Sequence, residues 1–266
     1  MKKVYVYAKE DRRSRDTAQL LAQKLMLAGF SVSSEWEGAA DYIACVGGDA
    51  TLLRMLAACD FPAIPIAGVN TGHLGFFQEF LPEDLDQLVD VFRTGQFYTQ
   101  KNRLLRAVVT TDDGSQQCFQ GLNDIVIRQD RSALIHLNMT IGPSFIERFS
   151  GDGLLFASAA GSTAYNYSLG GSIVDPRVSM MQITPMAPAN STAFRCFTSS
   201  LLVPADMEVI VYPDKEFSDS ANVIVDGTEH FFDDIREISI GYADAEVKLV
   251  RLENYDFWSK VKSKFL

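Results

Sequence analysis

The stretch CVGGDATLLRMLAAC, residues 45–59, is the part of the sequence that decides the fold. The apolar run DYIACV ends in two glycines and Asp49, and a leucine-rich segment with helical spacing follows. This order is typical of a buried strand that passes through a tight turn into a helix. The start of such a helix presents unpaired amide groups that favour an anion such as phosphate. Asp49 either caps this helix or contacts a ligand, and the spacing alone leaves both interpretations open.

Outward from this stretch, residues 1–100 alternate between strand and helix patterns. Pro82, Glu83 and Asp84 mark the start of one helix, and Gly95 marks its end. Alternating strands and helices predict an α/β domain with a Rossmann-like parallel sheet. The expected strands are residues 3–8, 41–46 and 62–70, and the expected helices are residues 15–29, 50–59 and 81–96.

After about residue 100 the pattern changes to short, often alternating strands. This predicts an all-β sandwich, followed by an amphipathic C-terminal helix over residues 255–266. The expected domains are an α/β domain over 1–100, a sandwich over 101–253, and a helix over 254–266 that packs back on the N-terminal domain. The strand-bearing segments are residues 104–129, with two strands around a turn at 112–114, and 133–142, 201–213, 221–232 and 245–253.

Composition excludes several classes of protein. The formal net charge of the 266 residues is −10, which argues against a nucleic-acid-binding face. The sequence has no apolar run of about 18 residues, so we expect no membrane span. The four cysteines are scattered without a CxxC pair, which predicts core packing in a reducing cytoplasm rather than a disulfide or zinc framework.

Two further glycine-rich stretches are candidates for ligand loops. NTGHLGFF, residues 70–77, follows an expected strand, and its His73 is interpreted as a loop residue. In GDGLLFASAAGSTAYNYSLGG, residues 151–171, small side chains permit close approach, Thr163 and Ser168 supply hydroxyls, and Tyr165 offers a ring for stacking. A nucleophilic role for Ser162 is disfavoured, because the G-x-S-x-G pattern and a triad histidine are absent.

Taken together, these segments resemble the ATP-dependent NAD kinases of the bacterial type, within the wider group of kinases that carry a GGDGT loop. The marks of that family are GGDGT, N-x-G-x-LGF, an Asn-Glu pair and a D-G…G-S-T-A-Y segment. Here they stand in the same order as GGDAT, NTGHLGF, LNDIVI and the segment at residues 151–171. The resemblance implies phosphoryl transfer from ATP to NAD, giving NADP.

The resemblance also implies roles for individual residues. Asp49 would be the catalytic residue, orienting the 2′-hydroxyl of the adenosine ribose and taking its proton. Magnesium would arrive with ATP, and a homodimer or homotetramer is expected. The residues that would contact phosphate are Gly47, Gly48, Ala50 and Thr51, and those that would contact NAD are Asp49, Ala50, Phe76, Phe77, Asn123, Asp124, Ser150, Asp152, Thr163, Ala164, Tyr165, Ser168 and Ala187.

The sequence departs from the family pattern at three of these positions. Ala50 replaces a glycine, which would cost about 1 kcal/mol if the position needed a positive φ. Asp124 is one methylene shorter than the family's Glu, and Ser150 stands where relatives often carry a cation. Two other functions therefore stay open, namely a lipid kinase of the diacylglycerol kinase type and a non-catalytic NAD-binding sensor. Polyphosphate is an alternative donor.

Overall fold

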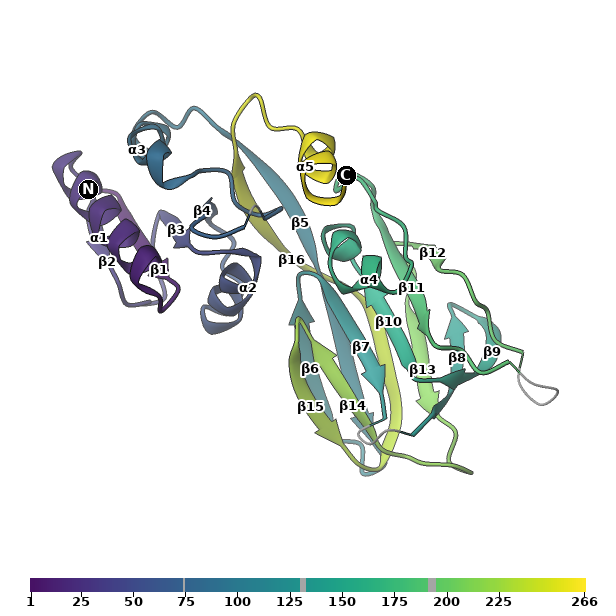
Figure 1. The fold of residues 1–266 in the computed structure, drawn as a ribbon. Helices are drawn as coiled ribbons and strands as arrows, with labels where there is room; N and C mark the ends of the chain where they lie inside the picture. Colours follow the sequence, from purple (N-terminus) through teal and green to yellow (C-terminus); the bar gives the residue numbers. More distant parts are fainter. Residues whose placement is uncertain (74, 130–132, 191–194) are drawn as a thin grey trace. The chain divides into compact units, whose positions relative to one another are not determined.

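The computed structural model describes residues 1–73, 75–129, 133–190 and 195–266 (Figure 1). It forms two compact units, one of Met1–Asn102 with Ala245–Leu266 and one of Arg103–Asp244. Two long strands, β5 (Tyr98–Thr111) and β16 (Ile235–Arg251), contribute residues to both units, because each unit boundary falls inside one of them.

The first unit is built on a parallel sheet with the strand order β2-β1-β3-β4-β16. Its register sets Val4 of β1 beside Tyr42 of β3, and Ile43 of β3 beside Ile66 of β4. The strands are β1 (Lys3–Ala8), β2 (Ser31–Ser33), β3 (Tyr42–Val46) and β4 (Pro65–Val69), and the helices are α1 (Arg12–Leu27), α2 (Asp49–Ala58), the short 3-10 helix η1 (Pro82–Asp84), α3 (Leu85–Thr94) and α5 (Phe257–Phe265).

The helices of this unit begin and end where side-chain chemistry favours it. Asp11 caps α1 by accepting a hydrogen bond from the Ser14 amide at 2.9 Å. Gly95 ends α3 in the left-handed conformation, at φ 73°. Buried residues of α1 and α3, such as Leu21 and Leu88, share one apolar cluster with alternate residues of the strands. These two helices therefore cover one face of the sheet.

The second unit is a sandwich of antiparallel strands. One of its sheets has the order β12-β11-β10-β7-β14-β15, and the other contains β13, β8, β9, β6 and parts of β5 and β16. Apolar residues from both sheets share one large cluster. The strands are β6 (Gln116–Gly121), β7 (Asp124–Arg128), β8 (Ile135–Ile141), β9 (Ser144–Gly151), β10 (Gly153–Ala157), β11 (Met180–Met186), β12 (Leu201–Pro204), β13 (Val209–Pro213), β14 (Ala221–Val225) and β15 (Thr228–Phe232), with η2 (Ala160–Thr163) and α4 (Tyr165–Ser168) between β10 and β11.

The predicted fold class is confirmed: a parallel α/β part, a β-sandwich part and a C-terminal helix are all present. The details differ in several places, and β9, β10 and β11 lie in a stretch for which no strand was predicted. Strand β2 has only three residues, too few to show a pattern in sequence. The segment at residues 104–129 holds three strands rather than two, because β6 and β7 are separated only by Leu122 and Asn123.

Two other expectations concern membrane-spanning helices and the cysteines. Within the described ranges, no helix is long and apolar enough to cross a membrane. Cys45, Cys59 and Cys196 are buried, as expected for core packing, whereas Cys118 is exposed. The described cysteines are all free thiols.

Candidate functional site

The GGDAT stretch forms the predicted turn from strand β3 into helix α2. Gly48 is the N-cap of α2, and Asp49 is the first helical residue. Gly47 has φ 156°, and a Cβ atom there would lie 2.4 Å from the Thr51 hydroxyl oxygen, so the position requires glycine. Ala50 is exposed and lies within α2, where a negative φ suits alanine. The departure at Ala50 therefore introduces no backbone strain.

The carboxylate of Asp49 does not cap its own helix, so the capping interpretation is wrong. Its two oxygens accept hydrogen bonds from the backbone amides of Phe76 at 3.0 Å and Phe77 at 3.1 Å. Gly75 permits this approach, because a Cβ atom there would lie 2.4 Å from a carboxylate oxygen of Asp49. The two glycine-rich loops of the first unit thus meet at Asp49.

The opposite side of the same loop is held by a buried cation. The Arg251 guanidinium donates to the carbonyl oxygens of Phe76 at 2.9 Å and Phe77 at 3.1 Å. It also pairs with Glu79 at 3.2 Å, and both side chains are buried. Arg251 and Asp49 therefore hold Phe76 and Phe77 from both sides, with the carbonyls of these residues toward the cation and their amides toward the acid.

Helix α5 closes over this loop. The ring of Phe76 packs against Phe257 and Phe265, each at 5.8 Å between centroids. Lys260 donates to the carbonyl oxygen of Gln78, and burial together with the nearby Arg251 lowers its pKa to about 8. Phe76 and Phe77 are both buried, so their place in a ligand wall stays a prediction.

In the second unit, the Asn123–Asp124 pair lies at the start of β7 on a turn pinned by another carboxylate. Asp226, at φ 47° in the β14–β15 hairpin, accepts hydrogen bonds from the amides of Leu122, Asn123 and Asp124 at 2.7, 2.8 and 3.1 Å. The side-chain oxygen of Asn123 is buried without a hydrogen-bond partner among the described residues. A buried acceptor of this kind is suited to a ligand donor.

The protonation of Asp124 follows from this setting. Burial, with a smaller contribution from the neighbouring Asp226, raises the pKa of Asp124 to about 7. Burial also raises the pKa of Asp226, against the opposing effect of its three amide donors. At neutral pH the Asp124 carboxyl is therefore able both to donate and to accept a hydrogen bond.

The third glycine-rich segment packs directly on this turn. Ser158 donates its amide to the Asn123 carbonyl at 2.9 Å, and a Cβ atom at Gly161 would lie 1.9 Å from that same carbonyl oxygen. Thr163 is buried, whereas Tyr165 is 44% exposed, which leaves its ring free to stack. Ala164 is half-buried and Ser168 is exposed on α4.

The remaining candidates of the second unit lie where β9, β10 and β11 meet. The Asp152 amide donates to the Met186 carbonyl at 2.9 Å, which places Asp152 beside the end of β11 and next to Ala187. Ala187 has φ 43°, an uncommon conformation for alanine. Ser150 is buried, and its hydroxyl has no partner among the described residues.

Ser162 is structural, in line with the sequence interpretation. Its hydroxyl donates to the Val174 carbonyl at 3.2 Å and accepts from the Val174 amide at 3.0 Å. The side chain is fully buried. The hydroxyl is therefore occupied in fixing the segment that precedes β11.

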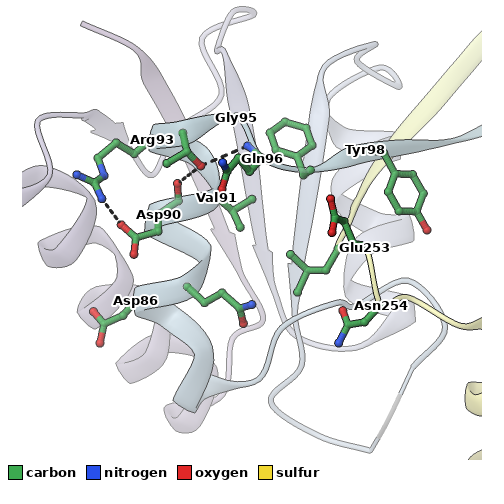
Figure 2. Close-up of a pocket in the computed structure, with 13 residues that line it drawn as sticks. Asp86, Asp90, Val91, Arg93, Gly95, Gln96, Tyr98, Glu253 and Asn254 are labelled. Carbon is green, nitrogen blue, oxygen red and sulfur yellow. Dashed lines mark hydrogen bonds and ion pairs between the residues drawn. The ribbon is translucent and has the colours of Figure 1, made fainter.

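A hollow of about 1300 Å³ lies elsewhere on the first unit, between α3 and residues 252–254 (Figure 2). Its walls carry Asp86, Asp90 and Glu253, and the Arg93 guanidinium is paired with Asp90 at 2.7 Å. None of the predicted site residues lines it. Its acidic walls do not suit a phosphate ligand.

Sequence reasoning missed four charged residues. Arg251, Lys260 and Lys264 contact the Asp49 loop, Lys264 with its ammonium 3.6 Å from the Asp49 carboxylate, and Asp226 contacts the Asn123–Asp124 turn. Each contacts its site from a distant point in the chain; Arg251, for example, is 174 residues from Phe77. No local motif marks them. No group of three or more described histidines, cysteines or acids is arranged to hold a metal ion.

The chain was compared with known proteins. The family description "ATP-NAD kinase N-terminal domain" matches residues 10–97, and "ATP-NAD kinase C-terminal domain" matches residues 122–252. An NAD kinase of Finegoldia magna is 33% identical over 99% of this chain and 97% of its own length. An NAD kinase of Leuconostoc citreum is 31% identical over 99% and 98%.

Two solved structures are similar over nearly the whole chain. An NAD kinase from Archaeoglobus fulgidus in complex with ATP has a TM-score of 0.77 at 25% identity and covers 99% of each chain. Yeast NADH kinase complexed with NADH has a TM-score of 0.84 at 19% identity, covering 99% of this chain and 87% of that one, and shows the shared fold. The fold and the Gly-Gly-Asp loop thus define a kinase. The chain belongs to the ATP-NAD kinase family.

Proposed function

We propose that this protein transfers the γ-phosphoryl group of ATP to the 2′-hydroxyl of the adenosine ribose of NAD, giving NADP. The observation that carries the proposal is the Asp49 carboxylate, held at the start of α2 by two amides of the second glycine-rich loop. A helix start favours the phosphates of the donor, and a fixed carboxylate beside it can orient an alcohol.

In the proposed reaction the ribose oxygen forms a bond to the γ-phosphorus while the bond to the leaving diphosphate oxygen breaks. The electron pair of the broken bond stays on that oxygen, and the hydroxyl proton passes to Asp49. The transition state is loose, so the proton leaves late and orientation contributes most of the effect. Asn123 and Asp124 would hold the adenosine portion, with Thr163, Ala164 and Tyr165 around the base. Asp152 and Ser168 would lie toward the nicotinamide half, and Ser150 and Ala187 would also contact NAD.

Magnesium is proposed to enter with ATP, where it neutralises charge on the phosphates. The donor set fits this role, because Asp49 is a carboxylate beside the phosphate-favouring helix start while the described residues offer no cluster of three metal ligands. We also propose a homodimer or homotetramer in the cytoplasm, and a role for Gly47, Gly48, Ala50 and Thr51 in contacting the donor.

A coupled assay for NADP tests the function. The purified chain is supplied with NAD and either ATP or polyphosphate, and product is measured with an NADP-specific dehydrogenase. Formation of NADP is the expected result. NAD binding without NADP would instead favour a sensor, and phosphorylation of diacylglycerol would favour a lipid kinase, which the family relationship does not favour.

A further inference from the structure

Helix α5 presents two lysines to the Asp49 site from the far end of the chain. Lys260 and Lys264 are one helical turn apart and therefore lie on the same side of the helix. Lys260 is bonded to the loop carbonyl of Gln78. The ammonium of Lys264 lies 3.6 Å from a carboxylate oxygen of Asp49 and 4.6 Å from the centroid of the Phe76 ring.

The two lysines differ in how firmly they are held. The Lys260 side chain is 16% exposed and occupied by the loop, whereas the Lys264 side chain is 36% exposed. Asp49 already accepts two amide hydrogen bonds, so its orientation does not depend on Lys264. An exposed ion pair of this kind is weak, and its ammonium sits on a flexible four-carbon stem. Lys264 is therefore free to exchange Asp49 for another anion.

The proposed reaction brings such an anion to Asp49. The phosphoryl group in transfer carries negative charge, and the Asp49 carboxylate beside it repels that charge. Among the described residues, Lys264 is the one basic side chain that forms an ion pair with Asp49. A cation placed where charge is carried in the transition state lowers the barrier.

We propose that Lys264 is a further catalytic residue, whose ammonium pairs with Asp49 in the resting protein and turns to the transferred phosphoryl group when ATP is bound. This inference rests on the proposed NAD kinase function. In this step the Lys264 side chain donates hydrogen bonds to the phosphoryl oxygens, while the proton of the alcohol goes to Asp49.

The test compares steady-state kinetics of Lys264→Gln, Lys264→Arg and Lys262→Gln with both substrates varied. Lys262 is exposed on the same helix and forms no ion pair with any described residue. Lys262→Gln therefore removes one positive charge from the helix without changing a contact of Asp49. We expect kcat of Lys264→Gln to fall by about 10- to 100-fold, the usual effect of a charge-assisted hydrogen bond. The KM for NAD should change by less than about twofold, as should all constants of Lys262→Gln.

Lys264→Arg keeps the charge and should recover most of the lost kcat, even if Lys264→Gln were to fold poorly. The inference is overturned if kcat of Lys264→Gln matches that of Lys262→Gln, if Lys264→Arg is as slow as Lys264→Gln, or if the loss lies in the KM for NAD alone. An active wild-type protein with an unaffected Lys264→Gln variant would refute the inference and leave the proposed function standing. A wild-type protein that makes no NADP would refute both.

Discussion

Replacement of Arg251 by methionine tests whether the buried cation holds the Asp49 loop in place. The Arg251 side chain is 1% exposed and that of Glu79 is 6%, with 3.2 Å between them. Breaking a buried ion pair on one side leaves the other charge uncompensated, at a cost of about 3–5 kcal/mol. In this protein the change also removes the hydrogen bonds that Arg251 donates to the carbonyl oxygens of Phe76 and Phe77 and to the side-chain oxygen of Gln100. We therefore expect a loss near the upper end of that range.

The assay is urea unfolding of a double-mutant cycle made of Arg251→Met, Glu79→Gln and the combined variant. Because the combined variant removes both charges of the Arg251–Glu79 pair, we expect it to be at least about 2 kcal/mol more stable than the sum of the single losses predicts, although Lys260, 4.0 Å from Glu79, loses its acid partner. Lys101→Met is the matched control: Lys101 is exposed and its partner Glu246, at 3.1 Å, is partly exposed, so this ion pair should contribute less than about 1 kcal/mol.

The catalytic effect follows from the same contact. Arg251 holds the carbonyls of the two residues whose amides face Asp49, so its loss should also slow NADP formation under conditions where the variant is folded. A free energy of unfolding within about 1 kcal/mol of wild type would refute the reasoning, as would strictly additive losses in the cycle.

Three further predictions concern Asp49, Asp124 and Gly161. Asp49→Asn should lower NADP formation by about 100-fold or more without a large change in Tm, and a loss of less than about tenfold would contradict a proton-accepting role. Burial raises the pKa of Asp124 to about 7, so its contribution to stability is complete below about pH 4 and is lost as the pH rises through 7. In urea titrations, the free energy of unfolding of the wild type should therefore fall by up to a few kcal/mol relative to that of Asp124→Asn between pH 4 and 8. A difference between the two proteins that stays constant with pH would count against this. Gly161→Ala puts a Cβ atom 1.9 Å from the Asn123 carbonyl oxygen and should lower Tm and raise the KM for NAD, whereas Gly241→Ala, which meets nothing within 4 Å, should leave the KM unchanged.

The parts of the fold that the sequence predicted are those determined by residues close to one another in the sequence. The turn from β3 into α2 follows from two glycines and an apolar run, and the end of α3 follows from Gly95. The sequence predicts a strand over residues 245–253, but β16 runs from Ile235 to Arg251. Its first part carries buried Ile238 and Ile240 at alternate positions, a strand signal that the sequence interpretation did not use.

The site is predictable only in part, for the same reason. The sequence identifies Asp49 and the Asn123–Asp124 pair, but it left open whether Asp49 caps its helix. The answer depends on amides 27 and 28 residues away. Asp226 lies 103 residues from Asn123, and no periodicity connects them. Contacts between distant segments are set by packing and leave no trace in a local pattern.

The double anchoring of residues 76–78 makes the length of this loop invariant. The adjacent amides of Phe76 and Phe77 both face an acid, while the carbonyls of the same two residues both face Arg251. One added or deleted residue would turn both sets of groups away from their partners at once. Homologous chains that keep the acid and the arginine should therefore vary in side chains here, yet never in residue count.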